Sequence, residues 1–384
     1  MCDVPALRFP EFSDEWEKCL ISDFGMVITG NTPPTKDVDN YKDGIKLWAS
    51  PIDLGKSKWI YDTQTKLSVT GFEKTRKLPQ GAILVTCIGS TIGKMGMATC
   101  EIATNQQINS IITNSDNDKD FVYYAIESKF PKYLTSVAIQ AVPIISKSSF
   151  ERLPNIRTTL TEQKKIGRFL SLIDKRIETQ NKIIEDLKKL KSAIVDKLYS
   201  SAKGETYSFR QLFEVVNEKN KKLIYSNVLS ASQELGMIER SDINIDIKFE
   251  QNSISEYKIV RKGDYVVHLR SFQGGFAFSD RTGICSPAYT ILHPNDLVAY
   301  GYLSHFFISK PFIKSLKLVT YGIRDGRSIN VDEWLDMTVT LPTKREQSHI
   351  LAIINAIDNK LHNENQIHNY MFRQRTYLLK TMFI

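Results

Sequence analysis

The sequence contains little of what catalysis or metal binding usually requires. Its five cysteines form no Cys-x-x-Cys pair and have no histidine at metal-ligand spacing, which argues against a zinc site or a redox pair. None of the six histidines lies within four residues of another, so neither a metal-binding pair nor a Ser-His-Asp grouping can be drawn. The sequence therefore predicts reduced thiols, no metal site and no catalytic constellation.

Three short motifs resemble catalytic loops, and each lacks a required feature. The segment Gly89–Met95 has one residue too few between its glycines for a phosphate-binding loop, and methionine follows its lysine where Ser or Thr is needed. Asn31–Thr35 lacks the residue order and the aromatic of an adenine methyltransferase loop, and Phe272–Phe276 contains no Gly-x-Gly. We interpret the first motif as a strand-to-turn segment in which Gly89 and Gly93 permit positive φ.

Long apolar runs are also absent. No uncharged apolar stretch of 18 residues occurs, and residues 1–8 lack the apolar core of a signal peptide, so we expect a soluble protein of the reducing cytoplasm with no membrane contact. A length of 384 residues predicts two or three domains. The chain has 51 Lys and Arg against 43 Asp and Glu, and the resulting charge of +8 favours a polyanionic partner.

The most informative feature is an internal repeat. Two stretches about half a chain apart carry an apolar ladder in steps of three and four residues, which is typical of a coiled-coil seam. Moving each position of the first ladder by 184 residues gives the second, and the polar breaks Gln180 and Lys191 return as Glu364 and Arg375. The pattern predicts a duplicated helix, and its apolar seam residues are Ile166, Leu170, Ile173, Ile177, Ile184, Leu187, Ile350, Ile354, Ile357, Leu361, Met371 and Leu378.

The segments before the two helices also correspond. Leu78–Val85 aligns with Val260–Val267, and each reads as a Gly-containing turn followed by a buried strand. Short β-branched and aromatic runs alternate with turns in both segments, so we predict two mixed α/β globular units, each followed by a long helix. A helix of about 38 residues cannot bury its seam alone. We therefore expect the two helices to pack antiparallel, with the globular units related by a pseudo-two-fold axis.

These residues resemble a known family. The opening Leu7–Phe12 with Glu15-Trp16, the turn Gly30–Pro33, the run Gly81–Leu84 and the motif Thr104–Gln107 are similar to the specificity subunit of type I restriction-modification enzymes. The Glu-Gln-x-x-Ile start of both long helices adds to the resemblance, which covers nearly the whole chain. One departure is that His368 replaces the apolar seam residue Ile184 in the second helix. That helix also ends without a cap, so we expect its last turns to be frayed or completed by a partner.

The resemblance implies an α/β (mixed α+β) fold with two target-recognition domains separated by two long antiparallel coiled-coil helices. The expected boundaries are 1–159 for domain 1, 160–203 for the central spacer helix, 204–343 for domain 2 and 344–384 for the C-terminal spacer helix. It further implies that each domain reads one half of a bipartite site on double-stranded DNA, while the helices set the unread gap. The helices would dock two methyltransferase subunits, and restriction subunits would join them. No cofactor is expected on this chain, and S-adenosylmethionine, ATP and magnesium are expected on the partner subunits.

Candidate DNA-reading residues follow from base chemistry. Arg and Lys suit guanine, and Asn and Gln suit adenine, when loops present them to the major groove. Each candidate taken singly also fits a surface charge or a structural cap, and the loop with Arg324 and Arg327 is the strongest of them. The candidates are Lys94, Asn105, Gln106, Gln107 and Lys147 in the first domain, and Arg270, Gln273, Arg281, Arg324 and Arg327 in the second.

A second interpretation comes from a different functional class. A coiled-coil adaptor that joins proteins and touches DNA only non-specifically would have the same helices and the same positive charge. The two interpretations make different predictions about sequence preference, because an adaptor binds random DNA as well as any target.

Overall fold

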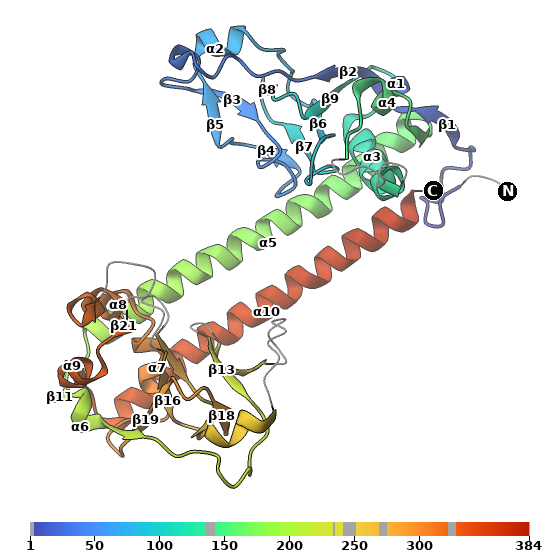
Figure 1. The fold of residues 1–384 in the computed structure, drawn as a ribbon. Helices are drawn as coiled ribbons and strands as arrows, with labels where there is room; N and C mark the ends of the chain where they lie inside the picture. The colour runs from blue at the N-terminus through green and yellow to red at the C-terminus, as the bar shows by residue number, and fades with distance from the viewer. Residues whose placement is uncertain are drawn as a thin grey trace. The chain divides into compact units, whose positions relative to one another are not determined.

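The computed structural model describes residues 4–135, 143–232, 235–240, 251–268, 275–321 and 328–383. The chain forms two compact units, of which the first comprises Met1–Lys182 with Asn365–Ile384 and the second Ile183–Glu364 (Figure 1). Each unit therefore contains a mixed α/β domain, the first part of one long helix and the last part of the other.

A five-stranded sheet with the order β2-β9-β6-β7-β4 forms the centre of the first unit. Its pairs are antiparallel except for β4, which runs parallel to β7 at the edge. Successive residues of a strand face opposite sides, so Ile83 and Val85 enter the core beneath helix α3 while Leu84 enters a second core. The bounds are β2 (Gly25–Thr29), β4 (Trp59–Ile60), β6 (Ile83–Thr86), β7 (Met95–Ala98), β9 (Ile108–Thr113) and α3 (Lys119–Thr135).

Smaller elements complete the first unit. A three-stranded sheet of order β5-β3-β8 supplies Leu47 to the second core, and β1 pairs with β10 just before the long helix. Their bounds are β1 (Glu17–Leu20), α1 (Ile21–Phe24), β3 (Lys46–Ala49), β5 (Thr65–Leu67), α2 (Val69–Glu73), β8 (Ala103–Thr104), α4 (Lys147–Glu151) and β10 (Pro154–Arg157).

The second unit repeats this topology. Its four-stranded sheet has the order β12-β19-β16-β17, which matches β2-β9-β6-β7, and the pair β11-β22 matches β1-β10. The predicted duplication and the mixed α/β class are therefore confirmed. The bounds are β11 (Glu205–Ser208), α6 (Phe209–Leu212), β12 (Phe213–Val216), β13 (Leu229–Ser232), β14 (Gly236–Glu239), β15 (Lys258–Val260), β16 (Tyr265–Val267), β17 (Phe276–Phe278), β18 (Gly283–Cys285), β19 (Thr290–Pro294), α7 (Tyr302–Phe306), α8 (Lys310–Ser315), β20 (Thr320–Tyr321), β21 (Ser328–Ile329), α9 (Val331–Asp336) and β22 (Thr338–Leu341).

The two aligned turns adopt the same backbone conformation. Gly81 before β6 has φ of 88°, and Gly263 before β16 has φ of 101°, a region that strongly favours glycine. Both strands that follow are fully buried. The sequence alignment therefore identified equivalent turns correctly.

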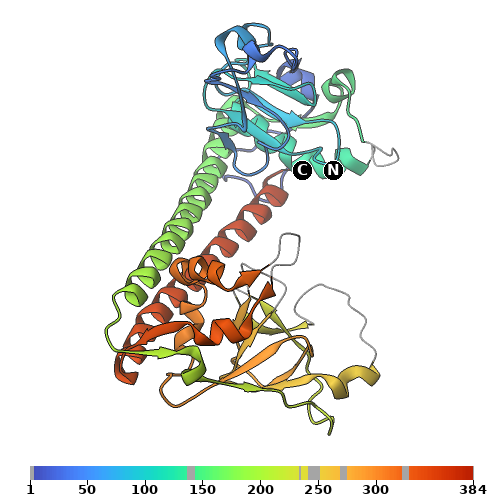
Figure 2. The same ribbon diagram turned by 60° about the vertical axis from the view of Figure 1, so that its left-hand side comes forward.

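The long helices α5 (Leu160–Ser200) and α10 (Lys344–Met382) lie side by side within each unit and run in opposite directions (Figure 2). All twelve apolar seam residues are buried or half-buried, as an antiparallel coiled coil requires. Two of the four polar breaks form ion pairs between α5 and α10: Arg375 binds Asp174 in the first unit, and Lys191 binds Asp358 at 2.5 Å in the second. No helix in the described ranges is both long and apolar enough to cross a membrane.

The end of α10 corrects one expectation. We expected its last turns to be frayed or completed by a partner, but Met382 and Phe383 are only 2% and 5% exposed. The Phe383 ring packs on Phe121 of α3 at 5.5 Å and on Trp16 at 6.0 Å between ring centroids. The N-terminal segment of the same chain therefore covers this end, which a helical periodicity cannot reveal.

Candidate nucleic-acid interface

The loop after β6 carries the first candidate, Lys94. Gly89 and Gly93 have φ of 92° and 90°, so the predicted strand-to-turn role of this segment is confirmed. The backbone NH of Gly93 donates to the carbonyl of Thr86, which closes the turn and brings the chain back into β7. The Lys94 side chain is exposed, and its carbon stem lies against Gly55. A rigid turn thus presents this ammonium group to solvent.

Two polar turns that are far apart in the sequence pack directly on each other. The backbone NH of Asn31 donates to the carbonyl of Thr104 at 2.9 Å, and the Thr32 hydroxyl donates to the Gln106 side-chain oxygen at 2.5 Å. A Cβ on Gly30 would lie 2.2 Å from the Thr104 carbonyl oxygen, so only glycine permits this approach. The motifs Gly30–Pro33 and Thr104–Gln107 therefore form one structural element.

The three amides of the second motif have different environments. Asn105 is 8% exposed, and its side chain bonds the backbone NH of Gln107 at 3.0 Å and the Gln107 side chain at 3.1 Å. This is the local role that amides in turns commonly take. Gln106 is exposed and Gln107 is half-buried, so these two have surface available for a ligand.

The remaining candidates are separate from this cluster. Lys147 begins α4 and lies 3.6 Å from Glu151. In the second unit the Arg281 guanidinium binds the carboxylate of its neighbour Asp280 at 2.8 Å. Four candidates lie outside the described residues: Arg270, Gln273, Arg324 and Arg327.

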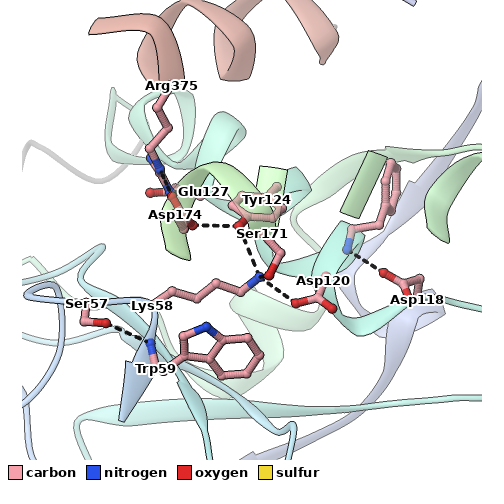
Figure 3. Close-up of polar contacts among 11 residues, drawn as sticks. Ser57, Lys58, Trp59, Asp118, Asp120, Tyr124, Glu127, Ser171, Asp174 and Arg375 are labelled. Atoms are coloured by element: carbon pink, nitrogen blue, oxygen red, sulfur yellow. Dashed lines mark hydrogen bonds and ion pairs between the residues drawn. The ribbon is translucent and has the colours of Figure 1, made fainter. Parts of the chain in front are cut away.

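Sequence reasoning missed a buried polar network in the first unit (Figure 3). The Lys58 ammonium, next to β4, binds Asp120 at 2.5 Å and lies 3.1 Å from the Tyr124 hydroxyl. That hydroxyl donates to Asp174 at 2.6 Å, and Asp174 accepts a hydrogen bond from Arg375. The network thus links a sheet edge to α3, α5 and α10.

The network continues from Arg375 to Glu127 at 2.7 Å and from Lys58 to the Ser171 hydroxyl at 3.3 Å. One signal in the sequence could have indicated it. Asp120, Tyr124 and Glu127 recur at helical spacing, so they place polar groups on one face of the helix.

Burial and charge act against each other within this network. The Lys58 side chain is 2% exposed, and burial lowers the pKa of its ammonium group while the Asp120 charge opposes that shift. Burial also tends to lower the pKa of Arg375, but the charges of Glu127 and Asp174 outweigh it and raise the pKa. Burial raises the pKa of the Tyr124 hydroxyl, which therefore remains a donor. The Lys58 and Arg375 charges are therefore held by acidic partners within the unit rather than presented to a ligand.

Comparison with known proteins follows the same duplication. The family model for the type I restriction modification DNA specificity domain matches residues 13–189 and again 204–370. The chain is 24% identical over 390 residues to the type I restriction enzyme MjaVIII specificity subunit of Methanocaldococcus jannaschii, covering 93% of this chain and 88% of that protein. It is 29% identical over 186 residues to the HindI specificity subunit of Haemophilus influenzae, covering 46% of this chain and 39% of that protein.

Solved structures show the same fold at low identity. The S subunit of the M. genitalium type I restriction-modification system has a TM-score of 0.59 and 16% identity, with 99% of both chains covered. A chain from a structure on complex assembly and conformational transition of a type I R-M system has a TM-score of 0.60 and 13% identity, with 96% of this chain and 97% of that chain covered. Because the two family matches together span most of the sequence, the chain belongs to the type I restriction-modification DNA specificity family and carries its DNA specificity domain twice.

Proposed function

We propose that this chain is the DNA-recognition subunit of a type I restriction-modification complex. Each of its two α/β domains reads one half of a bipartite site on double-stranded DNA, and the paired helices α5 and α10 set the length of the unread gap. The single observation that carries this proposal is the presence of two DNA specificity domains in one chain, each matched separately.

The partners in this proposal are two methyltransferase subunits, which dock on the paired helices, and restriction subunits that join that core. The name of one solved relative, which refers to complex assembly of a type I system, supports partnership in general terms. The chain itself contributes recognition and no catalytic group. S-adenosylmethionine, ATP and magnesium are bound by the partner subunits, and the complex acts in the cytoplasm.

The base-reading groups belong to the loops rather than to the buried network. Among the described candidates, Lys94, Gln106 and Gln107 are the first to test, because they are exposed or half-buried at neighbouring turns after β6 and before β9. Lys94→Ala, Gln106→Ala and Gln107→Ala should lower methylation of the target without loss of subunit assembly. The loop with Arg324 and Arg327 keeps its place as the candidate in the second domain.

The test is co-expression with the methyltransferase and restriction genes of the same system, followed by methylome sequencing. A split target with two constant half-sites and a fixed gap is the expected result. Methylation without any sequence preference would favour the adaptor interpretation and overturn the proposal. No observation on the fold or from the comparisons favours the adaptor at present.

A further inference from the structure

The Lys58 network connects the edge of the first unit's sheet to both long helices. β4 is the edge strand of that sheet, and Lys58 directly precedes it. The Lys58 ammonium lies within 3.3 Å of groups on α3 and α5. The Tyr124 hydroxyl donates a hydrogen bond to Asp174, which also accepts one from Arg375 on α10. Figure 3 shows these side chains meeting between the three helices and the strand.

Trp59 and Ile60 of β4 pack against the two cores of the unit, but the packing around Lys58 leaves open space. A cavity of about 510 Å³ borders the network and is lined by Lys58, Trp59, Glu127 and Arg375 among others. A second cavity of about 440 Å³ also borders the network, with Trp59, Asp120 and Ser171 in its wall. The polar bridge is therefore bordered by two open spaces.

The hydrophobic attachment of the sheet lies nearer the start of α5. Ile166 and Leu170, in its first turns, join the core that contains α3 and the inner face of the sheet. Apolar burial stabilises such a contact but is non-directional, whereas hydrogen-bonded ion pairs fix one geometry. Buried polar groups can in this way supply conformational specificity even where they add little stability.

Among the described residues of the second unit, no equivalent bridge occurs at the positions that match Tyr124 and Glu127. Its ion pair Lys191–Asp358 is the repeat of Arg375–Asp174. A shift of 182 residues, however, places Phe306 where Tyr124 stands and Ser309 where Glu127 stands. In the described part of this unit, Phe306 and Tyr302 instead pack on Tyr199 of α5. The two joints therefore differ in chemistry.

We infer that the Lys58 network fixes the orientation of the first unit's sheet on the spacer helices and thereby determines which gap length the complex accepts. This inference rests on the proposed function. One base pair added to the gap moves a half-site by 3.4 Å and rotates it by roughly 34° about the DNA axis. A sheet held at one angle rejects that displacement, and a sheet that pivots about its hydrophobic attachment accepts it.

The test uses the complete complex and a series of targets whose gaps are one base pair shorter, unchanged or one base pair longer. The main variant is Lys58→Met with Asp120→Asn, which removes both charges and leaves no unpaired ion. The parent should methylate the altered gaps at least about tenfold more slowly than its own. The double variant should lose at least about fivefold of that discrimination while both half-sites keep their sequence.

Matched variants separate orientation from stability. Lys58→Arg, which can still bind Asp120, should retain most of the discrimination. Lys191→Met with Asp358→Asn removes the repeat ion pair, which is not linked to a sheet edge, and should leave gap discrimination at the parental level. Leu84→Ala destabilises the first unit through its second core and should also leave gap discrimination at the parental level.

Three results would overturn the inference. These are unchanged discrimination in the double variant, equal relaxation in Leu84→Ala, or equal relaxation in the variant of the repeat pair. If the double variant does not assemble, Tyr124→Phe removes the hydroxyl link alone, and parental discrimination there would have the same consequence. A parental complex that methylates no split target would instead contradict the proposed function.

Discussion

Gln163 and Gln347 occupy equivalent positions at the starts of the two long helices, and both are almost fully buried. The Gln163 side chain accepts from the backbone NH of Asp118 at 2.9 Å and donates to the Thr158 carbonyl at 2.7 Å. Gln347 repeats this with the NH of Ala299 at 2.7 Å and the Pro342 carbonyl at 2.8 Å. The repeated Glu-Gln motif is therefore a joint between each helix and its own domain.

Truncation of either glutamine should be costly. Gln163→Ala leaves a buried NH and a buried carbonyl without their partner, and each such group costs about 1–3 kcal/mol. We expect a loss of about 2–4 kcal/mol in the free energy of unfolding, measured by denaturant titration, and a similar loss for Gln347→Ala. The neighbouring exposed Lys164→Ala should change it by less than about 0.5 kcal/mol. Equal effects of the buried and exposed variants would refute this role.

His305 provides a second test at the scale of one residue. Its Nδ1 is buried and has no hydrogen-bond partner among the described residues. Burial lowers its pKa to about 4, the Lys191 charge adds to this, and Asp358 opposes it. The imidazole is therefore neutral in the folded protein at pH 7.

The sign of the pH effect follows from that shift. Unfolded His305 takes up a proton below about pH 6.5 and the folded form only near pH 4, so stability falls as the pH decreases through this window. The full loss is at most about 3 kcal/mol. His305→Leu should remove this contribution to the pH dependence. Between pH 7 and pH 4 the free energy of unfolding of the parent should therefore fall by more than that of the variant. Parallel pH profiles would show that the site is not desolvated.

At the scale of elements, the sequence predicted the two long helices but not the acidic residues that pair with their polar breaks. The ladder of apolar residues and the recurrence of Lys191 and Arg375 were visible from the 184-residue repeat. Their partners Asp174 and Asp358 were not identified as such, because the register of two antiparallel helices depends on side-chain packing. The Lys58 network was missed for the same reason, since its members lie up to 317 positions apart in the chain. Candidate base readers were predictable only as residue types, because base chemistry specifies the side chain but not the loop that presents it.

The ion pairs also determine how a change in helix length should act. The ion pair Arg375–Asp174 lies in the first unit and the ion pair Lys191–Asp358 in the second. Four residues inserted after Asn181 therefore lengthen α5 between these two ion pairs but leave α10 unchanged. A matched insertion after Asn365 lengthens both. Four helical residues add about 6 Å, close to two base pairs at 3.4 Å each.

We therefore expect the paired insertion to widen the gap by about two base pairs with both half-sites unchanged, as read by methylome sequencing. The single insertion should methylate less, because one of the two ion pairs must break or α5 must bulge. An unchanged gap in the paired insertion would contradict the role of the helices in setting it. A changed half-site sequence would indicate that the insertion disturbs a domain.

At the scale of the whole molecule, each unit is completed by residues from both halves of the sequence. Phe383 packs against the first unit, and its repeat counterpart Tyr199 packs against Tyr302 and Phe306 of the second. A domain of this chain is therefore not a continuous stretch with its own helix. It is a continuous α/β segment that rests on the start of one helix and the end of the other.

This architecture predicts where a domain can be exchanged. Residues 205–340 include most of the second unit's strands but neither Tyr199 nor the ion pair Lys191–Asp358, so the helix pair survives their replacement. Replacement with the matching segment of a relative should change one half-site and leave the other half-site and the gap intact. The measurement is methylome sequencing of the chimera in the complete complex.

The contacts of Tyr199 with Tyr302 and Phe306 cross the boundary of the exchanged segment, so a relative that keeps aromatic residues at both positions is the matched choice. Loss of both half-sites in a folded, assembled chimera would show that the two domains form one composite reading surface, because independent domains cannot affect each other's bases.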